Sequence, residues 1–186
     1  MAKLNIPPEE RRIWTVSNFF TISRILALPF ILLLIKAPAT TENQIYLGIV
    51  LVWTFASDFL DGYIARKLNQ VSVMGKILDP LADKIVTIFA ALFTFLYKGM
   101  PLWIVVVIIA RDVIILAMSF IVMRKKQFIT VSNIYGKWAV TFIGLLIISY
   151  MFEASFLYFP LTILAMASVL ITIIFYGRNF IHTLHV

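Results

Sequence analysis

The chain contains no cysteine, two histidines and only nine acidic side chains among its 186 residues. The lack of cysteine excludes disulfides and thiolate chemistry. A zinc site is not expected either, because the two histidines, His182 and His185, stand at the C-terminal end. Charged residues make up 13% of the chain and hydrophobic residues 62%, and the mean hydropathy is +0.98. These values exclude a soluble globular protein of ordinary composition and indicate an all-α integral membrane protein.

Six apolar runs approach the length of about 20 residues that a helix needs to cross a bilayer. Turn-forming residues such as Pro38, Gly99 and Pro101 separate some of these runs. No repeat or low-complexity linker is visible, so we expect a single membrane domain over residues 1–186. The six expected spans are residues 19–35, 45–65, 76–97, 102–123, 135–152 and 157–176.

The segment before the first span, residues 1–18, is expected to be cytoplasmic or interfacial. Within it, residues 7–17 mix charge with Trp14, which is typical of an amphipathic helix at the membrane surface. A polar tail that carries topogenic charge is the alternative.

Lysine and arginine are distributed unevenly between the two ends of the expected spans. Eleven lie on one side and two on the other, which predicts that both termini and the loop after the second span are cytoplasmic. We therefore expect a multi-pass protein, in the bacterial inner membrane, with its active end in the cytoplasm and no nucleic-acid partner. The eleven are Lys3, Arg11, Arg12, Arg66, Lys67, Lys76, Arg124, Lys125, Lys126, Lys137 and Arg178, and the two are Lys36 and Lys98.

Four carboxylates interrupt this apolar pattern. Asp58 and Asp61 are three residues apart at the end of the second expected span, and Asp79 and Asp83 are four apart near the start of the third. These intervals place each pair on one helix face. An ionised aspartate in mid-bilayer costs about 2.5 to 3.5 kcal/mol on insertion scales, so the four acids need a wet cavity or bound cations. Oxygen ligands of this kind suit Mg²⁺ or Mn²⁺, and four are enough for a site that holds two metals.

Small and basic residues stand between the two acid pairs. Gly62 and Gly75 allow a ligand to approach the backbone, and Ala65 adds only a small side chain on the same face. The guanidinium of Arg66, one turn after Asp61, suits a diphosphate; for Arg66 alone, a topogenic surface charge is the alternative. Ser72 adds a possible hydroxyl donor.

The complete pattern is D-x2-D-G-x2-A-R-x8-G-x3-D-x3-D, which resembles the signature of the CDP-alcohol phosphotransferase (phosphatidyltransferase) family. All eight positions are present at the family's spacing, and a six-span topology would cover essentially the whole chain. Further residues resemble the branch that contains phosphatidylglycerophosphate synthases and CMP-forming cardiolipin synthases. They are Asn18 directly before the first span, Thr21, Arg24 and Pro29 within it, and the run Leu78 to Lys84.

The resemblance implies a role for each motif residue. Asp58, Asp61, Asp79 and Asp83 would hold two divalent cations, Mg²⁺ or Mn²⁺, that engage the donor diphosphate. Gly62, Arg66 and Ser72 would contact the head group of CDP-diacylglycerol, and Ala65 and Gly75 would leave room for the nucleotide. Asp83 would be the general base that takes the proton of an acceptor alcohol while CMP leaves. Members of the family are generally dimeric, so a homodimer in contact with membrane lipids is implied as well.

An acceptor that carries a phosphate needs cations of its own. Arg111, Lys137 and Arg24 are the candidates. The neighbouring Asp112 is not expected to pair with Arg111, because adjacent residues of a helix do not share a face. The alternatives are that Arg111 or Asp112 ties helices together through polar groups, and that Lys137 is a topogenic charge.

One position departs from the pattern of the resembling synthases. They commonly show G-K-x-K-T where this chain has Gly136, Lys137, Trp138, Ala139 and Val140, so one expected cation is missing. Transfer of a phosphatidyl group to glycerol 3-phosphate, a step of phospholipid biosynthesis, remains the preferred prediction. The alternatives are a cardiolipin synthase that uses phosphatidylglycerol, an inositol phosphate transferase, an ion-coupled transporter and an inactive scaffold.

Overall fold

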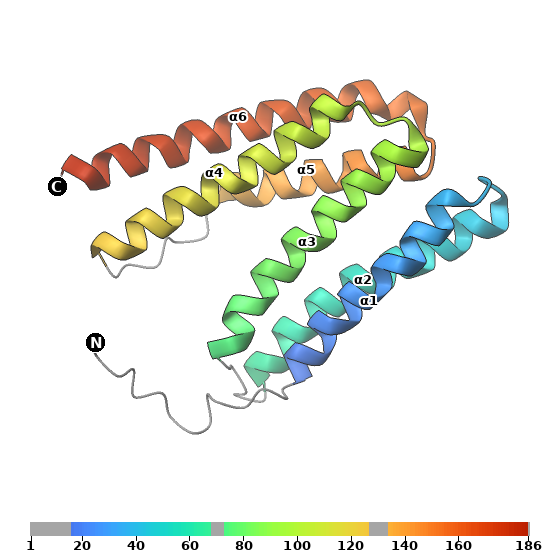
Figure 1. The fold of residues 1–186 in the computed structure, drawn as a ribbon, viewed down its shortest axis with the longest axis horizontal. Coiled ribbons are helices and arrows are strands. Elements are labelled where there is room, and N and C mark those ends of the chain that lie inside the picture. The colour runs from blue at the N-terminus through green and yellow to red at the C-terminus, as the bar shows by residue number, and fades with distance from the viewer. Residues whose placement is uncertain (1–15, 68–72, 127–133, 186) are drawn as a thin grey trace. The chain divides into compact units, whose positions relative to one another are not determined.

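The computed structural model describes the backbone of residues 16–67, 73–126 and 134–185. Side-chain surroundings are described for residues 22–57, 82–115, 117 and 134–178. Within these ranges the regular structure consists of six helices and contains no strand (Figure 1). The helices are α1 (Val16–Lys36), α2 (Thr41–Lys67), α3 (Val73–Lys98), α4 (Leu102–Lys126), α5 (Ile134–Met151) and α6 (Ser155–His185).

The helices confirm the all-α class and coincide with the six expected apolar runs. Most ends differ from the expected spans by a few residues, because the apolar runs continue into polar helical turns. The largest difference is in α6, which continues to His185 rather than ending near residue 176. The expected interfacial helix falls largely on residues 1–15, which lie outside the described residues.

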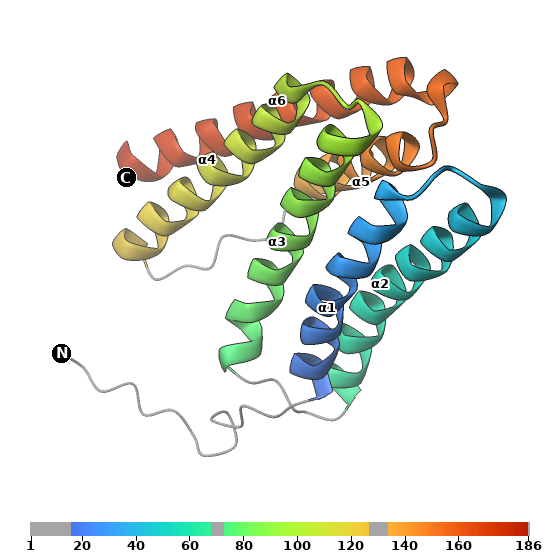
Figure 2. The same cartoon turned by 45° about the vertical axis from the view of Figure 1, so that its right-hand side comes forward.

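The chain divides into two compact units, residues 1–90 and 91–186. In the first unit, α1 and α2 form an antiparallel pair joined by a short connection (Figure 2). Thr40 caps α2, since its hydroxyl accepts a hydrogen bond from the Asn43 amide at 3.3 Å. One face of α1 is buried at intervals of three or four residues, as a helix packed on one side requires. Its members are Arg24, Ala27, Leu28, Ile31 and Ile35.

The second unit is built on the antiparallel pair α5 and α6, with α4 packed on α6. Its buried residues include Ile104 and Ile108 of α4, Leu146 of α5 and Val169 of α6. The turn between α5 and α6 passes through Glu153, whose φ of 56° is in the left-handed region. Such a residue ends a helix sharply.

Two of the described helices are long and apolar enough to cross a membrane, namely Ile134–Met151 and Ser155–Arg178 of α6. A buried core helix of a soluble protein could have the same composition, but only 39% and 22% of these two segments are buried. Large apolar side chains on them are exposed, among them Phe156 at 79% and Phe159 at 76%. The chain therefore has the surface of a membrane protein in this unit.

Candidate functional site

The four motif acids lie on the two helices that were expected to carry them. Asp58 and Asp61 belong to the last turns of α2, and Asp79 and Asp83 belong to the first half of α3. Only five residues separate the two helices, which limits the distance between their ends to about 20 Å. In both views the two ends lie at the same end of the first unit, where α1 also begins (Figures 1 and 2).

Most side chains of the motif lie outside the described part of the chain. Gly62, Ala65 and Arg66 are on α2 and Gly75 is on α3, while Ser72 is outside the described residues altogether. Asp83 is the one motif acid whose side-chain surroundings are described, and it is 52% exposed. Among the described side chains no group of three ligand-type residues occurs. The roles of the motif residues are thus predictions that the geometry leaves untested.

Asp83 forms an ion pair with Arg24 of α1. The guanidinium Nη1 of Arg24 donates a hydrogen bond to Oδ1 of Asp83, and the Arg24 side chain is only 3% exposed. Arg24 was expected to bind the acceptor alcohol, and sequence reasoning did not foresee its contact with a motif acid. The two residues are 59 positions apart, so no local pattern could reveal the pair.

The donor set fits a divalent cation by its chemistry. A carboxylate has two oxygens and about four lone-pair sites, so a bond from Arg24 at Oδ1 does not exhaust the capacity of Asp83. Asp58, Asp61 and Asp79 bring three more carboxylates to the adjoining ends of α2 and α3. Four carboxylates and no thiolate or imidazole suit Mg²⁺ or Mn²⁺.

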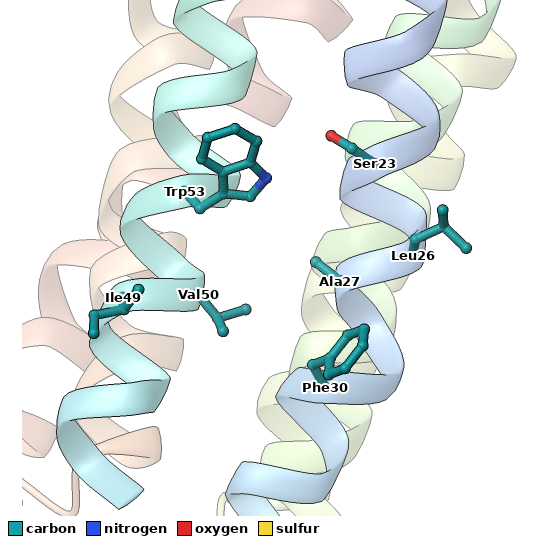
Figure 3. Close-up of a pocket in the computed structure, with 7 residues that line it drawn as sticks. All are labelled: Ser23, Leu26, Ala27, Phe30, Ile49, Val50 and Trp53. Atoms are coloured by element: carbon teal, nitrogen blue, oxygen red, sulfur yellow. The ribbon is translucent and has the colours of Figure 1, made fainter. Parts of the chain in front are cut away.

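An apolar groove of about 370 Å³ runs between α1 and α2 (Figure 3). Figure 3 shows Ser23 and Trp53 toward one end and Phe30 and Val50 toward the other. The end at Ser23 is one residue from Arg24. The groove follows α1 from Ser23 to Phe30, which is eight residues or about 10 Å. Its lining residues are Ser23, Leu26, Ala27, Phe30, Ile49, Val50 and Trp53.

The second unit holds a buried ion pair on α4. Arg111 Nη1 donates to Asp112 Oδ1 at 2.6 Å, and the two side chains are 8% and 10% exposed. The expectation that these neighbours do not pair was wrong. Their Cβ atoms point to different sides of the helix, but the long arginine side chain bends back to reach the adjacent carboxylate.

Arg111 also connects α4 to the start of α5. Its Nη2 lies 3.5 Å from the carbonyl oxygen of Gly136, which is the residue before the exposed Lys137. This contact agrees with the alternative that Arg111 ties helices together. It also brings Arg111 to the helix turn that carries Lys137, so two of the three predicted acceptor-binding residues lie in one region of the second unit.

Comparison with known proteins gives matches over most of the chain. A family model described as CDP-alcohol phosphatidyltransferase matches residues 14–175. A CDP-diacylglycerol–glycerol-3-phosphate 3-phosphatidyltransferase of Aquifex aeolicus is 35% identical over 166 residues, which cover 86% of this chain and 90% of that protein. A protein of the same name from Bacillus subtilis is 29% identical over 140 residues, which cover 68% and 72%. A CMP-forming cardiolipin synthase of Streptomyces coelicolor is 32% identical over 133 residues, which cover 70% and 61%.

The pair on α4 predicts that Asp112→Ala destabilises the protein strongly. It would leave the buried Arg111 without its counter-charge, which typically costs about 3 to 5 kcal/mol. We expect a clear fall of the melting temperature in detergent or lipid. The double variant Arg111→Met and Asp112→Ala should recover most of that loss, and Glu42→Gln, which removes an exposed acid of α2, should change little. A single Asp112→Ala variant as stable as the wild type would contradict the buried pair.

Proposed function

The chain belongs to the CDP-alcohol phosphatidyltransferase family, and from this premise we propose that it transfers a phosphatidyl group from CDP-diacylglycerol to glycerol 3-phosphate with release of CMP. The observation that carries the proposal is the complete motif at the adjoining ends of α2 and α3. Support for the acceptor comes from the relatives in Aquifex aeolicus and Bacillus subtilis, whose names state glycerol 3-phosphate. Cardiolipin synthesis is the second candidate, because one relative is named for it.

The donor is bound by the segment that joins the two acid pairs. Arg66 and Ser72 contact the charged head group, Gly62 lets it approach the backbone, and Ala65 and Gly75 leave space for the nucleotide. Asp58, Asp61, Asp79 and Asp83 would hold two divalent cations. When bound, Mg²⁺ or Mn²⁺ would neutralise charge on the diphosphate.

The reaction is a displacement at phosphorus. Asp83 accepts the proton of the acceptor hydroxyl, whose oxygen forms a new bond to the phosphorus of the phosphatidyl group. The bond from that phosphorus to CMP breaks, and CMP leaves with the electron pair. Positioning and charge compensation supply most of the rate, and general-base help contributes about 10² to 10⁴.

The acceptor phosphate is bound by Arg111 and Lys137 of the second unit. Lys137 is exposed and Arg111 is linked to the preceding residue, Gly136. Ala139, which is fully buried, stands where the resembling synthases carry a further cation, and its methyl side chain offers no charge. Arg111, whose charge is shared with Asp112, and Lys137 are therefore the two cations that bind the phosphate in this proposal.

Six spans and cytoplasmic termini complete the proposal. Each described helix has at least 18 residues, and the lysines and arginines favour one side of the spans eleven to two. We also infer a single catalytic domain, since the family match at residues 14–175 includes most of both units. We also propose that the chain forms a homodimer in the bacterial inner membrane.

The groove between α1 and α2 is a suitable place for an acyl chain of the donor. It is apolar, and it begins at Ser23, beside the arginine that contacts Asp83. A lipid whose diphosphate lies at the motif could thus extend one chain along α1. Each methylene buried there contributes about 0.8 kcal/mol.

Product analysis tests the reaction itself. Purified protein with CDP-diacylglycerol and Mg²⁺ or Mn²⁺ should release CMP and form phosphatidylglycerophosphate when glycerol 3-phosphate is added. Chelation of the cation, or any of Asp58→Ala, Asp61→Ala and Asp79→Ala, should abolish this release in protein that still inserts. Near-normal turnover by one of these variants would contradict the shared metal site, and cardiolipin formed from phosphatidylglycerol in place of the expected product would favour the second candidate.

Acceptor kinetics test Lys137. Lys137→Gln removes a charge-assisted contact with the phosphate, so the KM for glycerol 3-phosphate should rise about tenfold or more while the donor KM stays the same. Arg111→Gln should act in the same direction. Lys36→Gln, which removes an exposed cation from the end of α1, serves as the control. Unchanged acceptor kinetics in both site variants would refute the assignment.

Donor chain length tests the groove. Ala27→Phe and Val50→Phe each fill it from one wall, so the KM for a long-chain CDP-diacylglycerol should rise several-fold while that for a short-chain donor does not. Leu33→Phe, at an exposed position of α1 outside the groove, is the control for added bulk. Equal effects on long and short donors would show that the groove does not hold the chain.

A further inference from the structure

Arg24 occupies an unusual position for a charged residue. It lies on α1 among apolar side chains, and its own side chain is 3% exposed. The neighbouring residues of the same buried face are Ala27, Leu28 and Ile31. A guanidinium is permanently charged, so burying it is unfavourable unless a partner compensates the charge.

The partner is the last acid of the motif. Arg24 Nη1 donates to Asp83 Oδ1, which joins α1 to α3 within the first unit. Asp83 itself is half exposed, whereas the Arg24 side chain is buried, so the ion pair has one buried end and one half-exposed end. Because the Arg24 side chain is buried on the face that also carries Ala27, Leu28 and Ile31, its guanidinium has little room to move and is suited to favour one orientation of the Asp83 carboxylate.

We propose that Arg24 is a positioning residue for Asp83 and not a binding residue for the acceptor alcohol. Its function is to fix the carboxylate rotamer from which Asp83 accepts the proton of the acceptor. This inference rests on the proposed function, because the proton acceptor matters only if phosphatidyl transfer takes place. It differs from the sequence-based expectation, which placed Arg24 on the acceptor phosphate.

The backbone around Asp83 supports this geometry. Thr87 Oγ1 donates to the carbonyl oxygen of Asp83 at 2.9 Å, and Ala82, the preceding residue, is 2% exposed. The main chain at Asp83 is thus held by helix packing and by a side-chain hydrogen bond. Arg24 adds a charge-assisted hydrogen bond at the carboxylate, which favours one orientation of the Asp83 side chain.

Kinetics of Arg24 variants separate the two roles. Arg24→Gln should lower kcat about 10- to 100-fold, as loss of a partner that orients an active carboxylate typically does, with the KM for donor and acceptor within about twofold of the wild type. Arg24→Lys keeps the charge without the planar fork and should recover part of the loss. Lys36→Gln on the same helix should match the wild type. A rise in acceptor KM at unchanged kcat would overturn the proposal and restore the acceptor-binding role.

A double-mutant cycle with Asp83→Asn tests the coupling directly. Arg24→Gln combined with Asp83→Asn should be no slower than Asp83→Asn alone in single-turnover CMP release, because the orientation of the carboxylate no longer matters once its basicity is lost. Additive losses would overturn the positioning role.

The same four proteins give a readout without turnover. The melting temperature of the double variant should fall by less than the sum of the falls in the two single variants, and additive falls would show that the ion pair does not form. An inactive wild type in this assay would instead contradict the proposed function, while the melting cycle would still decide whether the pair exists.

Discussion

The cost of a charge within an apolar helix is the constraint on which the structure depends. Two arginines are buried in the described residues, Arg24 on α1 and Arg111 on α4, and each forms an ion pair with an aspartate. The first pair joins two helices and includes a motif acid, whereas the second is formed within α4. Removing one partner of a buried pair is more costly than removing both. A substitution of either residue in a pair therefore destabilises the protein less when the other residue is replaced as well.

Hydrophobic run length was sufficient to predict six helices, because an apolar run near 20 residues has few alternatives to a helix. Spacing also placed the motif acids on the correct two helices. The end of α6 could not be predicted in this way, since its last turns mix polar residues with Phe180, Ile181 and Leu184 and no longer form a continuous apolar run. Whether all six helices span the bilayer depends on more than length, and two of them qualify among the described residues.

The ion pairs were not predictable for two different reasons. Asp83 is 59 residues from Arg24, and a single sequence holds no information on which helix faces meet. Asp112 was excluded as a partner by the rule for adjacent residues, which describes Cβ directions and suits short side chains. Arginine has four carbon and nitrogen atoms between Cβ and its terminal nitrogens, so the rule underestimates its reach. A mid-helix arginine in an apolar chain should therefore be tested first against every nearby acid, including its direct neighbour.

The sequence separation of Arg24 and Asp83 has a consequence for biosynthesis. At translation rates of about 5 to 20 residues per second, the 59 residues between them take roughly 3 to 12 seconds to synthesise. During that interval α1 carries a guanidinium whose counter-charge does not yet exist. If α1 enters the bilayer as it is made, its apolar residues alone must compensate about 2.5 to 3.5 kcal/mol for the arginine. The ion pair then stabilises the finished fold but contributes nothing to the insertion of the helix that begins it.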